Sequence, residues 1–153
     1  FSRLRARGID TAEVLLHVGP GTFRPVQVED VSIHTVPPET FLLPEKTSAA
    51  IQRARARGAR VVAVGTTTTR VLESRARDGG LVEPGDGQTS LVVAPGYSFR
   101  AIDALVTNFH LPKSSLLLLV AAFAGRDRIL DAYAEALRHG YRFYSYGDAM
   151  LIR

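Results

Sequence analysis

The chain has 153 residues, of which 46% are hydrophobic and 22% charged, as expected for one globular domain with a sizeable core. The net charge of +4 is compatible with a nucleic-acid surface, but the basic residues are dispersed and do not by themselves indicate one. Cysteine is absent, which excludes disulfides and thiol chemistry, and no apolar stretch reaches the ~20 residues of a membrane helix.

Strands and helices are predicted to alternate along the first half of the chain. "AEVLLHV" (12–18) is a short apolar run typical of a buried strand, and a Gly- and Pro-containing loop (19–26) follows it. Two prolines exclude a helix from 32–44, which is therefore extended. The segment 45–57 is predicted to be a helix that a glycine ends, and "RVVAVG" (60–65) a strand buried on both faces.

The second half continues this alternation. Its predicted elements are a helix (66–77), a loop (81–89), a strand (90–95), an extended segment (97–108), two helices (113–124 and 126–139) and a strand with a turn (141–152). Because strands alternate with helices, we expect an α/β fold with a mostly parallel sheet and flanking helices, forming a single domain over 1–153.

The motif "VAVGTTTTRVLES" (62–74) joins a strand, a glycine turn and a helix start. Free N–H groups and threonine hydroxyls at a helix N-terminus can hold an anion or a carboxylate. Thr66 and Thr67 are the candidate contacts, and Arg70, one turn into the helix, is placed to reach the same ligand. The alternative is an ordinary threonine cap beside a surface arginine, and the pattern alone does not decide between them.

A glycine loop follows the first predicted strand in "LLHVGPGTFRPV" (15–26). Glycines permit close backbone approach to a ligand, and the loop adds a hydroxyl, an aromatic ring and a cation from Thr22, Phe23 and Arg24. The alternative is that the histidine has only a structural role in the strand. The candidate contacts are His17, Gly19, Gly21, Thr22 and Phe23.

"TNFHLPKSS" (107–115) gathers polar groups before an apolar helix. Pro112 suits the first helical position, but Lys113 then faces the positive end of the helix dipole. A bound anion, or a use for a lowered pKa, would explain a lysine at that place. The candidate site residues are Asn108, Phe109, His110, Lys113 and Ser114.

The last motif, "YRFYSYGDAMLI" (141–152), is rich in aromatic residues. Tyr146 is a candidate for stacking on a nucleobase, although aromatic residues near strands are more often core. Asp148 follows a glycine and suits a turn better than acid catalysis, but it is kept as a candidate contact. The four histidines are scattered, so no metal site is predicted.

Together these motifs resemble the S-adenosylmethionine:tRNA ribosyltransferase-isomerase family of queuosine biosynthesis. "LHVGPGTFRPV", "VAVGTTTTRVLES", "PGYSFRAIDALVTNFHLPKSSLLLLVAAFAG" and "YRFYSYGDAMLI" occur in the family's order and span nearly the whole chain. The resemblance implies the C-terminal part of an α/β core from a larger two-domain protein. It also implies that the inserted β-barrel domain of that protein lies outside this chain.

The resemblance also implies a reaction. The family moves the ribosyl part of S-adenosylmethionine to a 7-aminomethyl-7-deazaguanine base at the tRNA wobble position, giving epoxyqueuosine, adenine and methionine. S-adenosylmethionine is then a consumed co-substrate, no cofactor or metal is expected, and the partner is a tRNA anticodon stem-loop in the cytoplasm, with no membrane. His110 and His17 become candidate acid and base, because histidine titrates near pH 7, and Lys113 a candidate for a carboxylate or phosphate.

Four positions depart from the family pattern. Ile33 replaces an acidic residue, Pro37 replaces a second histidine, and Gln88 and Ser90 replace the tryptophan and aspartate of "GWTD". These departures leave two alternatives open: a non-catalytic RNA- or nucleotide-binding module, or a paralogue that modifies another acceptor. Release of adenine from S-adenosylmethionine would distinguish the enzyme from the binding module.

Overall fold

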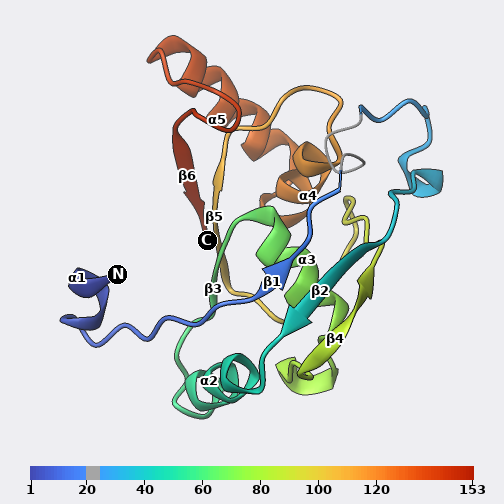
Figure 1. Cartoon of the computed structure of the whole chain (residues 1–153). Coiled ribbons are helices and arrows are strands. Elements are labelled where there is room, and N and C mark those ends of the chain that lie inside the picture. The colour runs from blue at the N-terminus through green and yellow to red at the C-terminus, as the bar shows by residue number, and fades with distance from the viewer. Residues whose placement is uncertain (20–24) are drawn as a thin grey trace.

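Two three-stranded sheets form the framework of the computed structural model, which describes residues 1–19 and 25–153 (Figure 1). The first sheet has the order β1-β2-β4 and the second the order β3-β5-β6. The strands are β1 (Leu15–Leu16), β2 (Glu39–Leu43), β3 (Val62–Val64), β4 (Gly85–Thr89), β5 (Ala104–Asn108) and β6 (Ala149–Ile152).

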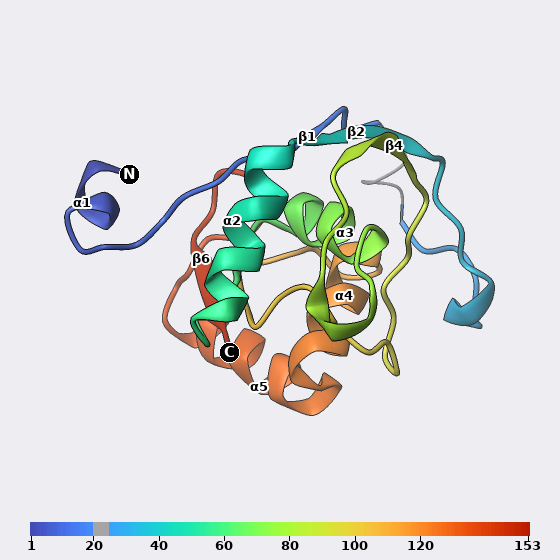
Figure 2. The ribbon, with the colours of Figure 1, turned by 90° about the horizontal axis from the view of Figure 1, so that it is seen from below.

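Helix α3 lies between the first sheet and α4, as the view in Figure 2 shows. It packs on strands of both sheets, so it links the two halves of the core. Helix α1 stands apart from the rest and buries none of its residues. The helices are α1 (Ser2–Arg5), α2 (Glu45–Ala56), α3 (Thr66–Ser74), α4 (Ser115–Ala124) and α5 (Arg126–Arg138), with short 3₁₀ turns η2 (Val31–Ile33) and η3 (Asp78–Gly80).

The core is aliphatic and is contributed by both sheets and by the helices. Leu43 of β2, Leu105 of β5, Val71 of α3 and Leu119 of α4 are fully buried and belong to one cluster. Burial of such side chains contributes about 1.5–3 kcal/mol each before entropy is counted. The cluster fixes the position of α3 and α4, whose N-terminal ends form the site described below.

The α/β class is confirmed, but the prediction of a mostly parallel sheet is wrong. Among the strands of residues 1–19 and 25–153, β3 and β5 alone pair in parallel, whereas β1 with β2, β2 with β4, and β5 with β6 are antiparallel. The strand after α3 does not continue the sheet of β3 but returns to pair with β2. Alternation of strands and helices in the sequence could not distinguish this arrangement from a parallel one.

Two neighbouring segments have secondary structures opposite to those predicted. The predicted loop 81–89 contains strand β4, in which Gly87 faces the ring of Phe41, and a Cβ there would lie 3.2 Å from the Phe41 Cζ. Glycine in a strand can mark such a close approach. The predicted strand 90–95 is irregular, and the carbonyl of Leu91 accepts a hydrogen bond from the Arg70 side chain at 3.0 Å.

Other boundaries are shorter than predicted. The strand expected over 12–18 is reduced to β1, and the segment 32–44, which was expected to be extended, begins within η2 before β2 follows. The helix expected from residue 113 begins at Ser115, after an N-cap at Ser114. Lys113 therefore precedes the helix and is not in its first turn.

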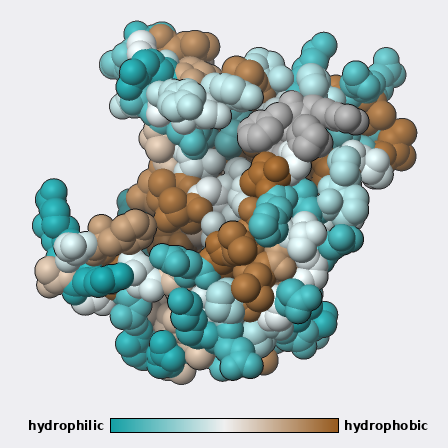
Figure 3. Space-filling view, in the orientation of Figure 1, coloured by the Kyte–Doolittle hydropathy of each residue, from teal (hydrophilic) through white to brown (hydrophobic). Residues whose placement is uncertain are grey.

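Hydrophobic side chains gather in the middle of the face shown in Figure 3, where β1 and β3 run. The exposed aliphatic residues of these two strands are Leu15, Val62 and Val64. The prediction of a strand buried on both faces at 60–65 is therefore wrong, because Val62 and Val64 of β3 are exposed and only Ala63 between them is buried.

None of the helices within residues 1–19 and 25–153 is both long enough and apolar enough to cross a membrane.

Candidate active site

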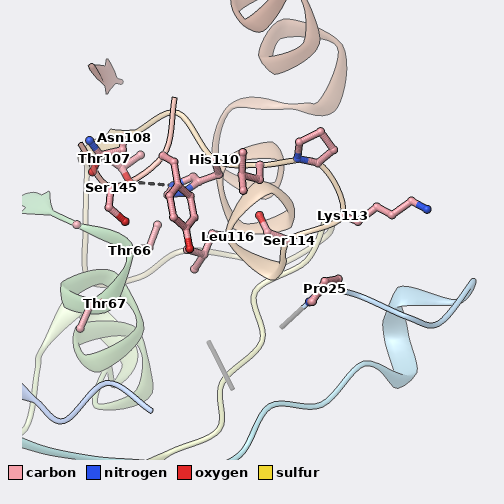
Figure 4. Close-up of a pocket in the computed structure, with 14 residues that line it drawn as sticks. Pro25, Thr66, Thr67, Thr107, Asn108, His110, Lys113, Ser114, Leu116 and Ser145 are labelled. Atoms are coloured by element: carbon pink, nitrogen blue, oxygen red, sulfur yellow. Dashed lines mark hydrogen bonds between the residues drawn. The ribbon is translucent and has the colours of Figure 1, made fainter. Parts of the chain in front are cut away.

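A cavity of about 310 Å³ lies where the N-terminal ends of α3 and α4 meet the end of β5 and the turn before β6 (Figure 4). It brings together residues from all four sequence motifs quoted above. The described residues that line it are Pro25, Gly65, Thr66, Thr67, Thr107, Asn108, His110, Leu111, Pro112, Lys113, Ser114, Leu116, Tyr144 and Ser145.

The two helix starts at the cavity differ in one respect. The Ser114 side chain caps α4 by accepting a hydrogen bond from the Leu117 N–H at 3.2 Å. The N-cap of α3 is Gly65, which has no side chain and supplies no such cap. The first turn of α3 therefore presents N–H groups and the side chains of Thr66 and Thr67 to the cavity, as an anion site requires.

His110 is a titratable residue of the cavity whose ring and backbone both have hydrogen-bond partners. Its side chain is buried and its Nε2 lies 3.0 Å from the Thr107 hydroxyl, while its backbone N–H donates to the Tyr133 hydroxyl at 2.7 Å. Burial lowers the pKa of His110 from 6.5 to about 4. The imidazole is therefore neutral at pH 7, so it can accept a proton but is not a resident acid.

Lys113 lines the cavity through its backbone rather than through its charge. Its carbonyl accepts a hydrogen bond from the Val26 N–H at 2.6 Å, and its φ is +60°. In Figure 4 its side chain points away from the cavity. The expected conflict with the helix dipole disappears, because the residue precedes the N-cap.

Arg70 does not reach the cavity, contrary to expectation. It is buried and forms an ion pair with Glu39, while its Nε donates to the Leu91 carbonyl. The other oxygen of Glu39 accepts from the Gly19 N–H at 2.8 Å. Gly19 is thus held by a protein carboxylate, and neither it nor Arg70 lines the cavity.

Phe109 is also structural in this fold. Its ring is buried in an aromatic cluster with Tyr133, Tyr141 and Phe143, at centroid distances of 5.2–5.8 Å. The cluster fixes the backbone next to His110, so Phe109 acts on the site by positioning its neighbour.

The turn before β6 separates the remaining candidates. Asn108 lines the cavity, and its side-chain amide donates to the carbonyls of Gly147 and Asp148 at 3.4 and 3.3 Å. Asp148 closes the turn by accepting from the Arg142 N–H at 2.7 Å. Tyr146 is 95% exposed and lies outside the cavity lining.

The glycine loop is only partly described. His17 is exposed, its N–H donates to the Thr40 carbonyl at 2.8 Å, and it is not among the lining residues. The predicted contacts Gly21, Thr22 and Phe23 lie outside the described residues. The chain that follows them reaches the cavity, because Pro25 pairs with Ser114.

Among the lining residues with polar side chains, sequence reasoning missed three. Thr107 lies near the end of the buried strand β5, and Tyr144 and Ser145 belong to the aromatic motif in which Tyr146 had been favoured. The available signal was the strand end for Thr107, since ligands often bind where strands end. Within the described part of the chain, no group of three or more His, Asp or Glu side chains is placed to hold a metal ion.

Comparison with known proteins shows which family this chain resembles. The family described as "Queuosine biosynthesis protein" matches residues 1–152. S-adenosylmethionine:tRNA ribosyltransferase-isomerases of Pelotomaculum thermopropionicum and Moorella thermoacetica are 59% and 58% identical over 99% of this chain. A crystal structure of S-adenosylmethionine tRNA ribosyltransferase from Thermotoga maritima is 45% identical, with a TM-score of 0.80 over 99% of this chain.

An α/β chain with this cavity and these motifs belongs to the queuosine biosynthesis protein family. The chain spans 45% and 44% of the two enzymes and 48% of the crystallised chain, so about half of each relative has no counterpart in it.

Proposed function

We propose that this chain provides the cavity in which an S-adenosylmethionine:tRNA ribosyltransferase-isomerase opens its donor. The reaction transfers the ribosyl part of S-adenosylmethionine to a 7-aminomethyl-7-deazaguanine base at the tRNA wobble position and gives epoxyqueuosine, adenine and methionine. The observation that supports this most is the pairing of a neutral, buried His110 with the uncapped start of α3 in one cavity.

The start of α3 would hold the methionine carboxylate of the donor. Its first N–H groups and the hydroxyls of Thr66 and Thr67 favour a negative group, and the described lining contains no acidic residue that would repel one. The cavity is large enough for part of the donor, and the rest of the site would come from the half of the family's chain that is not represented here.

His110 would act first as base and then as acid. As a neutral imidazole it accepts the proton removed from the carbon beside the sulfonium. Burial makes the resulting imidazolium a strong acid, which returns that proton to the departing adenine. One residue then performs both steps with no net gain of protons, and the exposed His17 is not needed for either.

The outward direction of Lys113 favours a contact with RNA rather than with the donor. At the cavity rim its ammonium group would meet a phosphate of the anticodon stem-loop, which would bring the acceptor base to the cavity. S-adenosylmethionine would serve as a co-substrate, with no cofactor, in the cytoplasm where tRNA and the donor occur together.

The four departures from the family pattern lie away from this cavity. Ile33, Pro37, Gln88 and Ser90 are all exposed, and none lines the cavity in the described part of the chain. Donor chemistry is therefore expected to persist, and the effect of the departures would fall on the acceptor.

The test is a chimaera in which this chain replaces the matched segment of the Pelotomaculum thermopropionicum relative. We expect it to release adenine from S-adenosylmethionine only when an acceptor tRNA is present. His110→Gln should reduce the rate about a hundredfold or more, as loss of a general base does.

His139→Gln is the matched control, because His139 is an exposed histidine at the C-cap of α5, where it pairs with Glu135 at 2.6 Å. The proposal fails if the chimaera releases no adenine, or if His110→Gln and His139→Gln turn over equally. Salt-dependent RNA binding without adenine release would instead support a non-catalytic binding module.

A further inference from the structure

Tyr144 reaches the cavity from a backbone conformation that tyrosine rarely adopts. Its φ is +72°, it is 46% exposed, and it lines the cavity. Within the described part of the chain, Lys113 is the other non-glycine residue with a positive φ, and it lines the same cavity. Left-handed non-glycine residues are uncommon and cluster at ligand sites, so this coincidence marks the cavity as functional.

The turn itself holds Tyr144 in this conformation. The Tyr144 N–H donates to the Phe109 carbonyl at 2.8 Å, and the Tyr144 carbonyl accepts from the Gly147 N–H at 3.0 Å. Gly147 has no room for a side chain, because a Cβ there would lie 2.3 Å from the Arg142 carbonyl oxygen. The conformation is therefore set by the fold and requires no ligand.

The neighbouring aromatic residues face the opposite way. Phe143 packs on Phe109 and Tyr133 at centroid distances of 5.2 and 5.5 Å, and Tyr141 lies 5.8 Å from Phe109. Core packing accounts for these rings. Tyr144 differs from them, because it is half-exposed and lines the cavity.

We infer that Tyr144 is a stacking platform for a purine-like ring. The inference rests on the proposed function, which supplies two such rings: the adenine of S-adenosylmethionine and the 7-deazaguanine of the acceptor. A tyrosine face stacks on either ring, and Ser145, the next residue in the chain, lines the same cavity with a hydroxyl that can hydrogen-bond to the edge of such a ring.

The absence of tryptophan from the chain allows a direct test. Tyr144→Trp places a single indole at the cavity, and Tyr146→Trp places one two residues away at a 95% exposed position outside the lining. Each variant of the 153-residue chain is titrated separately with S-adenosylmethionine, adenine and 7-aminomethyl-7-deazaguanine while indole fluorescence is recorded.

Saturable quenching in Tyr144→Trp but not in Tyr146→Trp is the expected result. Quenching by adenine and S-adenosylmethionine would identify the donor ring as the ligand, and quenching by the deazaguanine would identify the acceptor ring. Tyr144→Leu should weaken binding of that ring about five- to a hundredfold, and Tyr144→Phe, which keeps the ring, should not.

The inference is overturned if no probe quenches the Tyr144→Trp indole saturably, or if both indoles respond alike. Its failure is distinct from that of the proposed function. A chimaera that releases adenine while the Tyr144→Trp indole stays silent defeats the stacking platform alone. Saturable quenching with an inactive chimaera defeats the proposed reaction and leaves the platform in place.

Discussion

The polar side chains at the two ends of α3 differ in what they face. From its middle to its C-terminus, Arg70 is paired with Glu39, and Glu73 accepts hydrogen bonds from the Tyr97 hydroxyl and the N–H groups of Arg100 and Ala101. At its N-terminus, Thr66 and Thr67 face a cavity and the first turn has no side-chain cap. Polar groups whose partners belong to the fold build the structure, whereas those that face an open cavity remain available to a ligand.

The largest effect should come from breaking the buried pair. Arg70→Met leaves the Glu39 carboxylate buried without its cationic partner and should lower the free energy of unfolding by about 3–5 kcal/mol. Urea denaturation measures this loss. Arg57→Met is the control, because Arg57 and Asp10 are paired at 3.1 Å with both side chains more than half exposed, and its loss should stay below about 1 kcal/mol.

Equal losses in these two variants would contradict the structural role of the Arg70–Glu39 pair. They would also reopen a ligand role for Arg70.

The next effect concerns His110 and pH. Its pKa is lowered from 6.5 in the unfolded chain to about 4 in the fold, so the unfolded state binds more protons between these values. The contribution of His110 to the free energy of unfolding is therefore fully present above pH 6.5. It is lost as pH falls towards 4, and the loss amounts to about 3 kcal/mol.

Chemical denaturation at several pH values tests this dependence. His110→Gln should lose less stability between pH 6.5 and 4 than the unsubstituted chain, and the exposed His139→Gln should behave like that chain. Parallel curves for all three proteins would mean that His110 titrates normally.

The smallest effect lies at the capped helix start. Ser114→Ala removes the acceptor for the Leu117 N–H and should cost about 1 kcal/mol of stability, which Ser114→Asn should restore because asparagine also caps helices. Thermal unfolding measures both variants. An unchanged midpoint in Ser114→Ala would show that α4 does not depend on its cap, and the contrast with the uncapped α3 would lose its meaning.

The sequence predicted where the site lies better than it predicted which residues form it. The Gly65 turn and the "TNFHLPKSS" motif both reach the cavity, because a strand end followed by a helix start is encoded locally. Arg70 was misplaced because its partner Glu39 is distant in sequence, and no local pattern indicates which arginine is buried.

The strand pairing was misjudged for the same kind of reason. β4 is rich in glycine and polar residues and does not resemble a strand, yet it pairs with β2, where Gly87 accommodates the Phe41 ring. Conversely, the apolar segment 90–95 is irregular because a side chain of α3, rather than a neighbouring strand, binds its backbone at Leu91. Tertiary contacts overrode local propensity in both cases.

Two adjacent threonines allow the most direct test that the open end of α3 is the donor site. Thr67 lines the cavity, whereas Thr68 lies outside its lining and donates its hydroxyl to the Val64 carbonyl at 2.8 Å. The measurement is isothermal titration of the chimaera with S-adenosylmethionine, comparing Thr67→Val and Thr68→Val. We predict that Thr67→Val weakens binding about tenfold or more, as loss of a hydrogen bond to a charged group does, while Thr68→Val binds normally. Equal affinity of both variants, or a loss confined to Thr68→Val, would contradict a donor site at the start of α3.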